Sequence, residues 1–317
     1  MKYFPYLRGK QFELIALRDM CSFYEQKDII SPIIEPIKQV NSTLLKTIDC
    51  LVQNTVNFNI ILNPKCGEVS SENYDRLILD VINKLDGYDN YQPTFIINEQ
   101  VNLKRIISII KDLGLENISL VITAQPRNES DFKALLDSTS IRYAILYDDS
   151  SIRRLSRNIR PLGTELVILA DRFNLKEKNA DYVNPSDEFF SDDHLFFEKE
   201  GYSGYGDYIT IGNNYNEGGF LPYAVAIHLT YLDGPENIFR IHHFVSDSND
   251  DNSDVPGKVA EALSKLVPFI DERKMNTDAC RQLRQIYHDE SYPGLGSIKK
   301  LSILNHLQLV YNLFSAK

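Results

Sequence analysis

Polar and charged side chains stand directly after most of the short apolar runs in this sequence. If these runs are parallel strands of one sheet, their carboxyl ends meet at one edge, and the polar groups would surround a single site. Such a mixed set of carboxylates, amides and basic groups could hold a polar ligand, with a guanidinium as a fork for phosphate or carboxylate. The candidate ligand-binding residues are Arg8, Lys10, Glu35, Asn63, Asn98, Glu99, Gln125, Asp148, Asp171, Arg172, Asp207 and Tyr208.

Several carboxylates in this set have the oxygen chemistry that Mg²⁺ or Mn²⁺ prefers. One of these ions is therefore the cofactor that the residues would suit, although the sequence identifies no cofactor and no metal ligand. No histidine follows the apolar runs, which argues against zinc. A structural interpretation stays open as well, because strand-end Asp, Asn and Glu also cap helices and pair with neighbouring charges. The carboxylates concerned are Glu35, Glu99, Asp148, Asp171 and Asp207.

Histidine and cysteine offer little further chemistry. His242 and His243 are adjacent in an expected strand, so their side chains point to opposite faces and are unsuited to one metal ion. We expect His228 to pair with His242 across a hairpin, which is a structural role. The four cysteines form no CxxC pair, which is typical of reduced thiols. Cys66 is the thiol nearest the expected site, but no GxSxG motif or nearby histidine marks a nucleophile.

The elements that must position the candidate residues are apolar runs of strand character, most of them followed by helix-like sequence. This alternation predicts a (β/α)8 TIM-like barrel, a fold of about 250 residues. The rival is an open doubly wound sheet, but that fold expects a glycine-rich phosphate turn, and neither GxGxxG nor GxxxxGK[ST] occurs. The number of strands also favours closure. The expected strands are residues 3–9, 31–37, 58–64, 93–99, 118–124, 142–148, 165–171 and 206–212.

Further elements surround and follow the eighth expected strand. Residues 172–203 are polar, acidic and aromatic, and we interpret them as a long loop or a short helix. Alternating apolar residues at 224–245 predict a β-hairpin inserted after the eighth strand. We therefore expect an α/β fold and a single barrel domain, with the barrel in 1–212 and the hairpin, a closing helix and C-terminal helices in 213–317. The expected late helices are residues 257–270, 278–288 and 298–314. The last helix is apolar around much of its girth, so it either packs against the barrel or awaits another chain.

Composition and charge limit the classes of partner. The chain has 317 residues, of which 43% are hydrophobic and 25% charged, as in ordinary globular proteins. Its formal net charge of −10 disfavours nonspecific binding to nucleic acid. The basic helix face of Arg153, Arg154 and Arg157 could still contact nucleic acid. Ion pairs between these arginines and nearby carboxylates explain the basic residues equally well. No apolar run approaches the ~20 residues of a membrane span, and no signal peptide is recognised. We expect no membrane contact and a cytoplasmic location.

The N-terminal sequence carries a set of residues that resemble one family. A proline precedes an Arg-Gly-Lys turn, a Glu and an Ala-Leu pair follow, and a second strand reads I-S-P-I-I-E. In these features, and in a Tyr-Gly-Asp-Tyr segment at 205–208, the chain resembles the beta-protein family of bacteria and phages. The resemblance implies a TIM-barrel-like fold, a bacterial or phage origin, and relatives near mobile elements and defence genes, but no reaction. The matching positions are Pro5, Arg8, Gly9, Lys10, Glu13, Ala16, Leu17, Pro32 and Glu35.

Two hypotheses about function follow. The first is a binding or sensing component of a bacterial anti-phage defence or mobile-element system. It would engage a partner protein, or a second copy of itself, through the barrel mouth and the C-terminal elements, and the family resemblance favours it. The second is a metal- or acid/base-dependent hydrolase of a phosphorylated small molecule or nucleotide, which the strand-end carboxylates and Arg8 favour. The sequence leaves open whether the protein is an enzyme.

Overall fold

The computed structural model describes residues 2–69, 74–160, 163–217 and 221–316, and the chain forms two compact units. We call the unit of Met1–Lys10, Gln26–Asp171 and Asp193–Asp207 the barrel unit. The unit of Gln11–Glu25, Arg172–Asp192 and Tyr208–Lys317 is the C-terminal unit. The expectation of a single domain stays a prediction.

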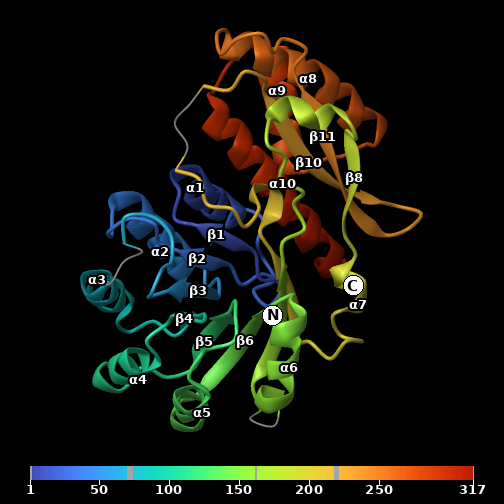
Figure 1. The fold of residues 1–317 in the computed structure, drawn as a ribbon. Coiled ribbons are helices and arrows are strands. Elements are labelled where there is room, and N and C mark those ends of the chain that lie inside the picture. The colour runs from blue at the N-terminus through green and yellow to red at the C-terminus, as the bar shows by residue number, and fades with distance from the viewer. Residues whose placement is uncertain (1, 70–73, 161–162, 218–220, 317) are drawn as a thin grey trace. The chain divides into compact units, whose positions relative to one another are not determined.

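An eight-stranded parallel sheet forms the barrel unit, and its strands are ordered as they occur along the chain (Figure 1). The first and last strands meet near the N-terminus. Tyr3 bridges to Tyr205, and the backbone amide of Phe4 donates to the Tyr205 carbonyl at 2.8 Å, so the sheet is nearly closed. The predicted TIM-like barrel is therefore confirmed. The strands are β1 (Tyr6–Arg8), β2 (Ile33–Glu35), β3 (Phe58–Ile61), β4 (Tyr91–Ile97), β5 (Ile118–Ile122), β6 (Ile141–Tyr147), β7 (Glu165–Ala170) and β9 (Gly204–Asp207).

The last barrel strand lies earlier in the chain than residues 206–212. It is β9, whereas Ile209–Ile211 forms the short 3₁₀ helix η3 in the C-terminal unit. The extended backbone ends because Ile209 adopts a φ of +52°, in the left-handed region. Glycine is needed in β9 itself, since a Cβ on Gly206 would lie 2.2 Å from the Phe4 carbonyl oxygen. This close approach brings β9 against the chain before β1.

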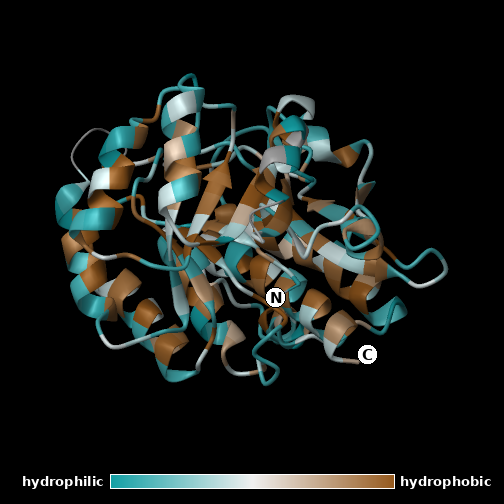
Figure 2. Cartoon of the chain, turned by 90° about the horizontal axis from the view of Figure 1, so that it is seen from below, coloured by the Kyte–Doolittle hydropathy of each residue, from teal (hydrophilic) through white to brown (hydrophobic). Residues whose placement is uncertain are grey.

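Helices alternate with the barrel strands, and most begin at a side chain that caps the first turn. Asn102 and Asn128, for example, each accept a hydrogen bond from a backbone amide of the helix that follows. Figure 2 shows that the strands are largely hydrophobic and that the helices carry both hydrophobic and hydrophilic residues, as amphipathic helices do. The helices of the barrel unit are α2 (Ser42–Gln53), α3 (Asp75–Leu85), α4 (Leu103–Asp112), α5 (Glu129–Ser138), α6 (Ser150–Ile159) and α7 (Asp193–Phe196).

One contact between strands that are not neighbours shows which side chains point into the barrel. The Ser119 hydroxyl on β5 donates to Asn59 Oδ1 on β3 at 2.7 Å, so both residues face the interior. Ile33 pairs with Asn59, and Glu35 lies two residues further along β2. Because side chains alternate along a strand, Glu35 and its register partner Arg8 also face inward. They lie at the carboxyl ends of their strands, the end that we call the mouth.

The C-terminal unit contains a three-stranded antiparallel sheet in the order β10-β11-β8. The hairpin of β10 (Ala226–Asp233) and β11 (Ile238–Val245) is confirmed. Residues 172–203 are not simply a loop or short helix, however, because β8 (Asp187–Ser191) pairs with β11 and a 3₁₀ helix, η2 (Asn179–Val183), precedes it. The strand was missed because DEFFS is short and opens with two carboxylates, which are rare in strands.

In the described part of the C-terminal unit, four helices of ten or more residues accompany the sheet. The last one is buried over much of its girth and contacts β10, α9 and α1, so its apolar residues form part of the core of this unit. Salt bridges join it to α1, where Lys300 Nζ lies 2.7 Å from Asp19. Within the described ranges, no helix is both long enough and apolar enough to cross a membrane. The helices are α1 (Gln11–Met20), α8 (Val255–Glu272), α9 (Asp278–His288) and α10 (Leu295–Ser315).

Candidate functional site

Glu35 is the carboxylate that the mouth encloses most completely, with 0% of its surface exposed. Its Oε2 accepts a hydrogen bond from the Tyr6 hydroxyl at 2.8 Å. Its Oε1 accepts from the backbone amides of Lys65 at 2.8 Å and Cys66 at 3.2 Å. The side chain therefore ties the end of β2 both to β1 and to the loop that follows β3.

Arg8 lies beside this carboxylate and is also buried. Its Nε lies 4.0 Å from Glu35 Oε2, and its side chain hydrogen-bonds Cys66. Burial and the charge of Glu35 raise the pKa of the Cys66 thiol, although Arg8 and Lys65 act against this shift. A thiol with a raised pKa stays protonated and is a poor nucleophile at neutral pH. The mouth thus joins a carboxylate, a guanidinium and a neutral thiol in one buried group.

The amides and neighbouring groups at the next strand ends make local contacts. Asn63 bridges to the backbone of Ile96, to which its Nδ2 donates at 2.9 Å and from which its Oδ1 accepts at 2.7 Å. Asn98 Oδ1 accepts from the amide of Gln100, which closes a turn. The two remaining candidates of this region lie near the surface. Exposed Glu99 lies 4.0 Å from Arg127, and Gln125 donates to Glu129 in the first turn of α5.

The last candidates diverge in position. Asp207 is buried and accepts a hydrogen bond from the Tyr3 hydroxyl at 2.8 Å. The ring of Tyr205 contacts Phe197, in the segment after α7, and therefore points away from the barrel interior. Asp207 lies two residues further along β9, on the same face as Tyr205, so its side chain also points away from the interior. Asp171 is exposed, while Lys10 and Asp148 are partly exposed. Arg172 and Tyr208 belong to the C-terminal unit.

The structure therefore brings together Arg8 and Glu35, with Tyr6 and Cys66 as additional members. A shared ligand for the other candidates stays a prediction, as does a Mg²⁺ or Mn²⁺ cofactor. In the described part of the chain, no three His, Cys, Asp or Glu side chains form a group that could hold a metal ion.

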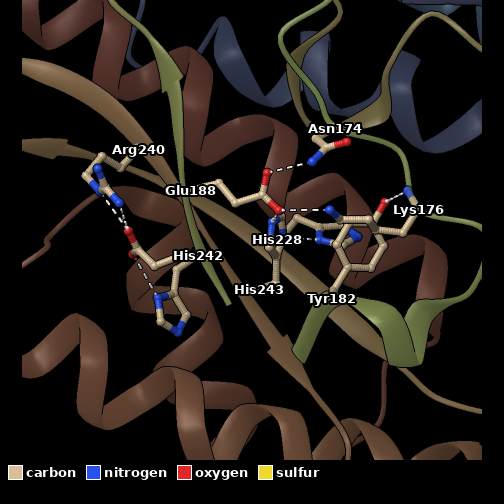
Figure 3. Close-up of polar contacts among 9 residues, drawn as sticks. Asn174, Lys176, Tyr182, Glu188, His228, Arg240, His242 and His243 are labelled. Atoms are coloured by element: carbon tan, nitrogen blue, oxygen red, sulfur yellow. Dashed lines mark hydrogen bonds and ion pairs between the residues drawn. The ribbon is translucent and has the colours of Figure 1, made fainter. Parts of the chain in front are cut away.

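A histidine pair in the C-terminal unit forms a second polar cluster (Figure 3). The register places His228 opposite His243, and His242 opposite Leu229, so the expected pairing of His228 with His242 is wrong. The turn between the strands runs from Gly234 to Asn237, and a turn one residue shorter would have set His228 opposite His242. His228 Nδ1 lies 2.8 Å from His243 Nδ1. One imidazole must donate to the other, so the pair shares one proton.

The charge of a nearby carboxylate favours one direction for this hydrogen bond. Glu188 Oε1 lies 3.8 Å from His243 Nε2 and 3.5 Å from Lys176 Nζ. Since a carboxylate favours a donor opposite it, we infer that His243 carries its proton on Nε2 and accepts from His228 at Nδ1. Burial lowers the pKa of His228 to about 3 and, despite the charge of Glu188, that of His243 to about 4. Both imidazoles are therefore neutral at neutral pH.

The opposite face of the same sheet holds a charged group. Asp187 accepts from Arg240 Nε at 2.6 Å, from the Tyr231 hydroxyl at 2.8 Å and from His242 Nδ1 at 3.0 Å. Burial raises the pKa of Asp187, but the bonds from His242, Tyr231 and Arg240 outweigh it and lower the pKa overall. Adjacent residues of β8 thus anchor two clusters on two faces. The alternation of side chains in DEFFS is the signal that could have revealed them.

The basic helix is α6, and Arg154 and Arg157 are exposed on it. Together with Lys133 they line a groove of about 790 Å³ against α5. Glu129 and Asp137 line the same groove, so its charge is mixed. The side chain of Arg153 lies outside the described residues. Nucleic-acid binding at this helix stays a prediction.

No family model matches the chain, and no curated protein matches it.

Proposed function

We propose that this protein is a binding component of a bacterial anti-phage defence or mobile-element system and that it acts by engaging a partner protein. The observation that carries the proposal is the state of Glu35, the best-placed acid/base candidate at the mouth. Each of its oxygens accepts hydrogen bonds: Oε2 from the Tyr6 hydroxyl and Oε1 from two backbone amides of the loop after β3. A carboxylate committed to holding a loop favours a binding surface over proton transfer.

The segment 172–192 of the C-terminal unit supports a partner surface. Leu175, Val183 and Phe189 are 52%, 61% and 50% exposed, respectively. Several large apolar side chains exposed on one short segment are typical of an interaction site. The apolar residues of α10 are largely buried within their own unit, so this segment replaces α10 as the proposed partner-binding element. The N-terminal resemblance to the beta-protein family supports the defence or mobile-element context.

A phage challenge tests the proposal. Cells that carry the gene with its native neighbours are compared with cells that carry V183S/F189S, which removes the exposed apolar side chains and leaves the buried core intact. We expect the native gene to lower the plating efficiency of at least one phage and the double variant to lose protection. The control is L79S, since Leu79 is 51% exposed on α3 in the other unit. Absence of protection against every phage tested, or equal protection by V183S/F189S, contradicts the proposal.

The buried guanidinium of Arg8 favours one alternative, a hydrolase of a phosphorylated small molecule or nucleotide. In that case Arg8 would bind the substrate phosphate, since guanidinium forks match phosphate oxygens. Phosphate release from a panel of nucleotides and sugar phosphates, with Mg²⁺ present, distinguishes the two functions. Release by the native protein that R8K abolishes, with R8K still folded by circular dichroism, would replace the binding proposal with the hydrolase.

A further inference from the structure

Strand β8 forms one edge of the sheet in the C-terminal unit. The strand order is β10-β11-β8, so β8 pairs with β11 on one side (Figure 1). In the described ranges no strand pairs with its other side. An unpaired strand edge presents a row of amides and carbonyls to which another chain can bond. This edge belongs to the segment 172–192 that we propose as the partner surface.

The register identifies the backbone groups that point outward from β8. The His243 amide donates to the Ser186 carbonyl at 2.7 Å, so Ser186 faces β11. Because the direction alternates along an antiparallel strand, the amides and carbonyls of Asp187 and Phe189 point away from β11. Among the described residues, no group bonds these outward amides and carbonyls. They are therefore available to an added strand.

The side chain of Phe189 makes this edge apolar at its centre. Phe189 is 50% exposed, whereas its neighbour Phe190 is buried. Proteins commonly protect an edge strand with lysine or proline, and the sequence of β8, DEFFS, contains neither. An exposed phenylalanine on an unpaired edge favours a surface that another chain covers.

A pocket of about 240 Å³ lies beside the start of β8. It is lined by Ser186, which immediately precedes the strand, and by the apolar side chains of Val183, Phe244 and Phe269, among others. Extended peptides that add to a sheet edge gain specificity from pockets that receive their alternate side chains. The pocket can therefore receive an apolar side chain of an added strand.

Charge favours a basic occupant over a second copy of this chain. The segment 172–192 contains five acidic and three basic residues. Its ion pairs involve Asp187 and Glu188, whereas no described residue forms an ion pair with Glu177, Asp181 or Asp192. Pairing with β8 of a second copy would bring like charges together, which is destabilising. Lysine or arginine side chains of a different chain would complement them.

We propose that β8 binds an extended segment of the partner protein as a fourth strand of this sheet, and that the segment alternates basic and apolar residues. The proposal rests on the proposed partner-binding function and names the structure and chemistry that the partner presents. Backbone hydrogen bonds to Asp187 and Phe189 provide the pairing. Contact with Phe189 and with the pocket provides the specificity.

Selection of peptides from a random dodecapeptide library on the native protein tests this proposal. We expect the selected peptides to be basic, to alternate with apolar residues, and to bind saturably in fluorescence anisotropy. N-methylation of each backbone amide in turn should weaken binding at every second position, because only alternate amides of an added strand face β8. Uniform loss along the peptide, or loss at one position alone, would exclude strand addition.

F189P and F189A form a matched pair of protein variants. Both lack the aromatic ring, but only F189P lacks the outward amide, and proline is tolerated on edge strands. We expect F189P to bind the selected peptides about tenfold more weakly than F189A, equivalent to ~1.4 kcal/mol. Circular dichroism checks that both variants retain the fold. Equal binding by F189P and F189A would overturn the proposal.

A second pair of variants tests the charge of the partner segment. E177Q/D192N should weaken binding of the basic peptides severalfold. The control D250N/E272Q removes the same charge from exposed residues of the same unit and should bind as the native protein does. Equal weakening in the two variants, or the absence of any peptide that binds saturably, would overturn the proposal.

These results are distinguishable from a failure of the proposed function. If V183S/F189S abolishes phage protection while the peptide experiments fail, the partner function stands and strand addition at β8 is wrong. If the peptides bind as expected while no phage is restricted, strand addition is supported and the defence context is wrong.

Discussion

Lowering the pH from about 8 to about 5 should destabilise the C-terminal unit through the His228–His243 pair. In the folded protein, burial lowers the pKa values of these residues to about 3 and about 4. In the unfolded chain both titrate near ~6.5. Above that value both states are neutral and the pair has no effect. As the pH falls below it, only the unfolded state takes up protons, so stability is lost between about pH 6.5 and the folded pKa values.

The expected magnitude follows from these values. At about pH 5 each histidine is almost fully protonated when unfolded and mostly neutral when folded, which costs ~2 kcal/mol per residue and ~4 kcal/mol for the pair. Urea unfolding followed by circular dichroism at several pH values measures this loss. The double variant H228N/H243N lacks both groups and should lose ~4 kcal/mol less than the native protein over the same range.

The control for this experiment is H288N, since His288 is exposed on α9 and far along the chain from the pair. It should retain the full pH dependence of the native protein. If the double variant loses stability as steeply as the native protein between about pH 8 and 5, then burial does not keep His228 and His243 neutral in the folded protein.

Three further outcomes are expected for the folded state. Substituting Gln for Glu35 should lower the free energy of unfolding by ~2–4 kcal/mol in urea titrations, because an amide cannot accept all the hydrogen bonds that the carboxylate accepts. An unchanged midpoint of urea unfolding would mean that Glu35 does not anchor the loop after β3. Substituting Ala for Gly206 should sharply lower the melting temperature, since the added Cβ meets the Phe4 backbone, whereas G234A, whose Cβ meets nothing within 4 Å, should melt as the native protein does. Truncation before Ile298 should cause aggregation in light scattering, because α10 fills the core of the C-terminal unit; a soluble monomer would show that this helix is dispensable.

The barrel could be predicted because its signal is repeated along the chain. Runs such as Phe58–Ile61 are buried on both faces, and continuous apolar sequence of this kind marks a parallel strand. The position of the last barrel strand was harder to predict. The isoleucines after Asp207 continue the apolar pattern, but the strand ends before Ile209, which adopts a left-handed conformation. The pattern of apolar residues does not indicate where the backbone leaves the extended conformation.

The candidate site was only partly predictable, and the reasons are physical. Arg8 and Glu35 were found because strand ends meet at one mouth, and their register confirms that they are neighbours. The role of Tyr6 could not be found, since its contact with Glu35 depends on the register of two short strands. The pairing of His228 with His243 likewise depends on one residue of turn length, which the sequence does not determine.

The contact between Tyr3 and Tyr205 also constrains how the chain folds as it is made. The Tyr3 hydroxyl reaches Asp207, a separation of 204 residues in the sequence. At typical rates of synthesis the first strand therefore waits ~10–40 s for its partner to emerge. During that time the outer edge of β1 is unpaired and open to association with other chains. Slow translation before residue 207 should thus raise the demand for chaperones, although every earlier βα unit is already complete.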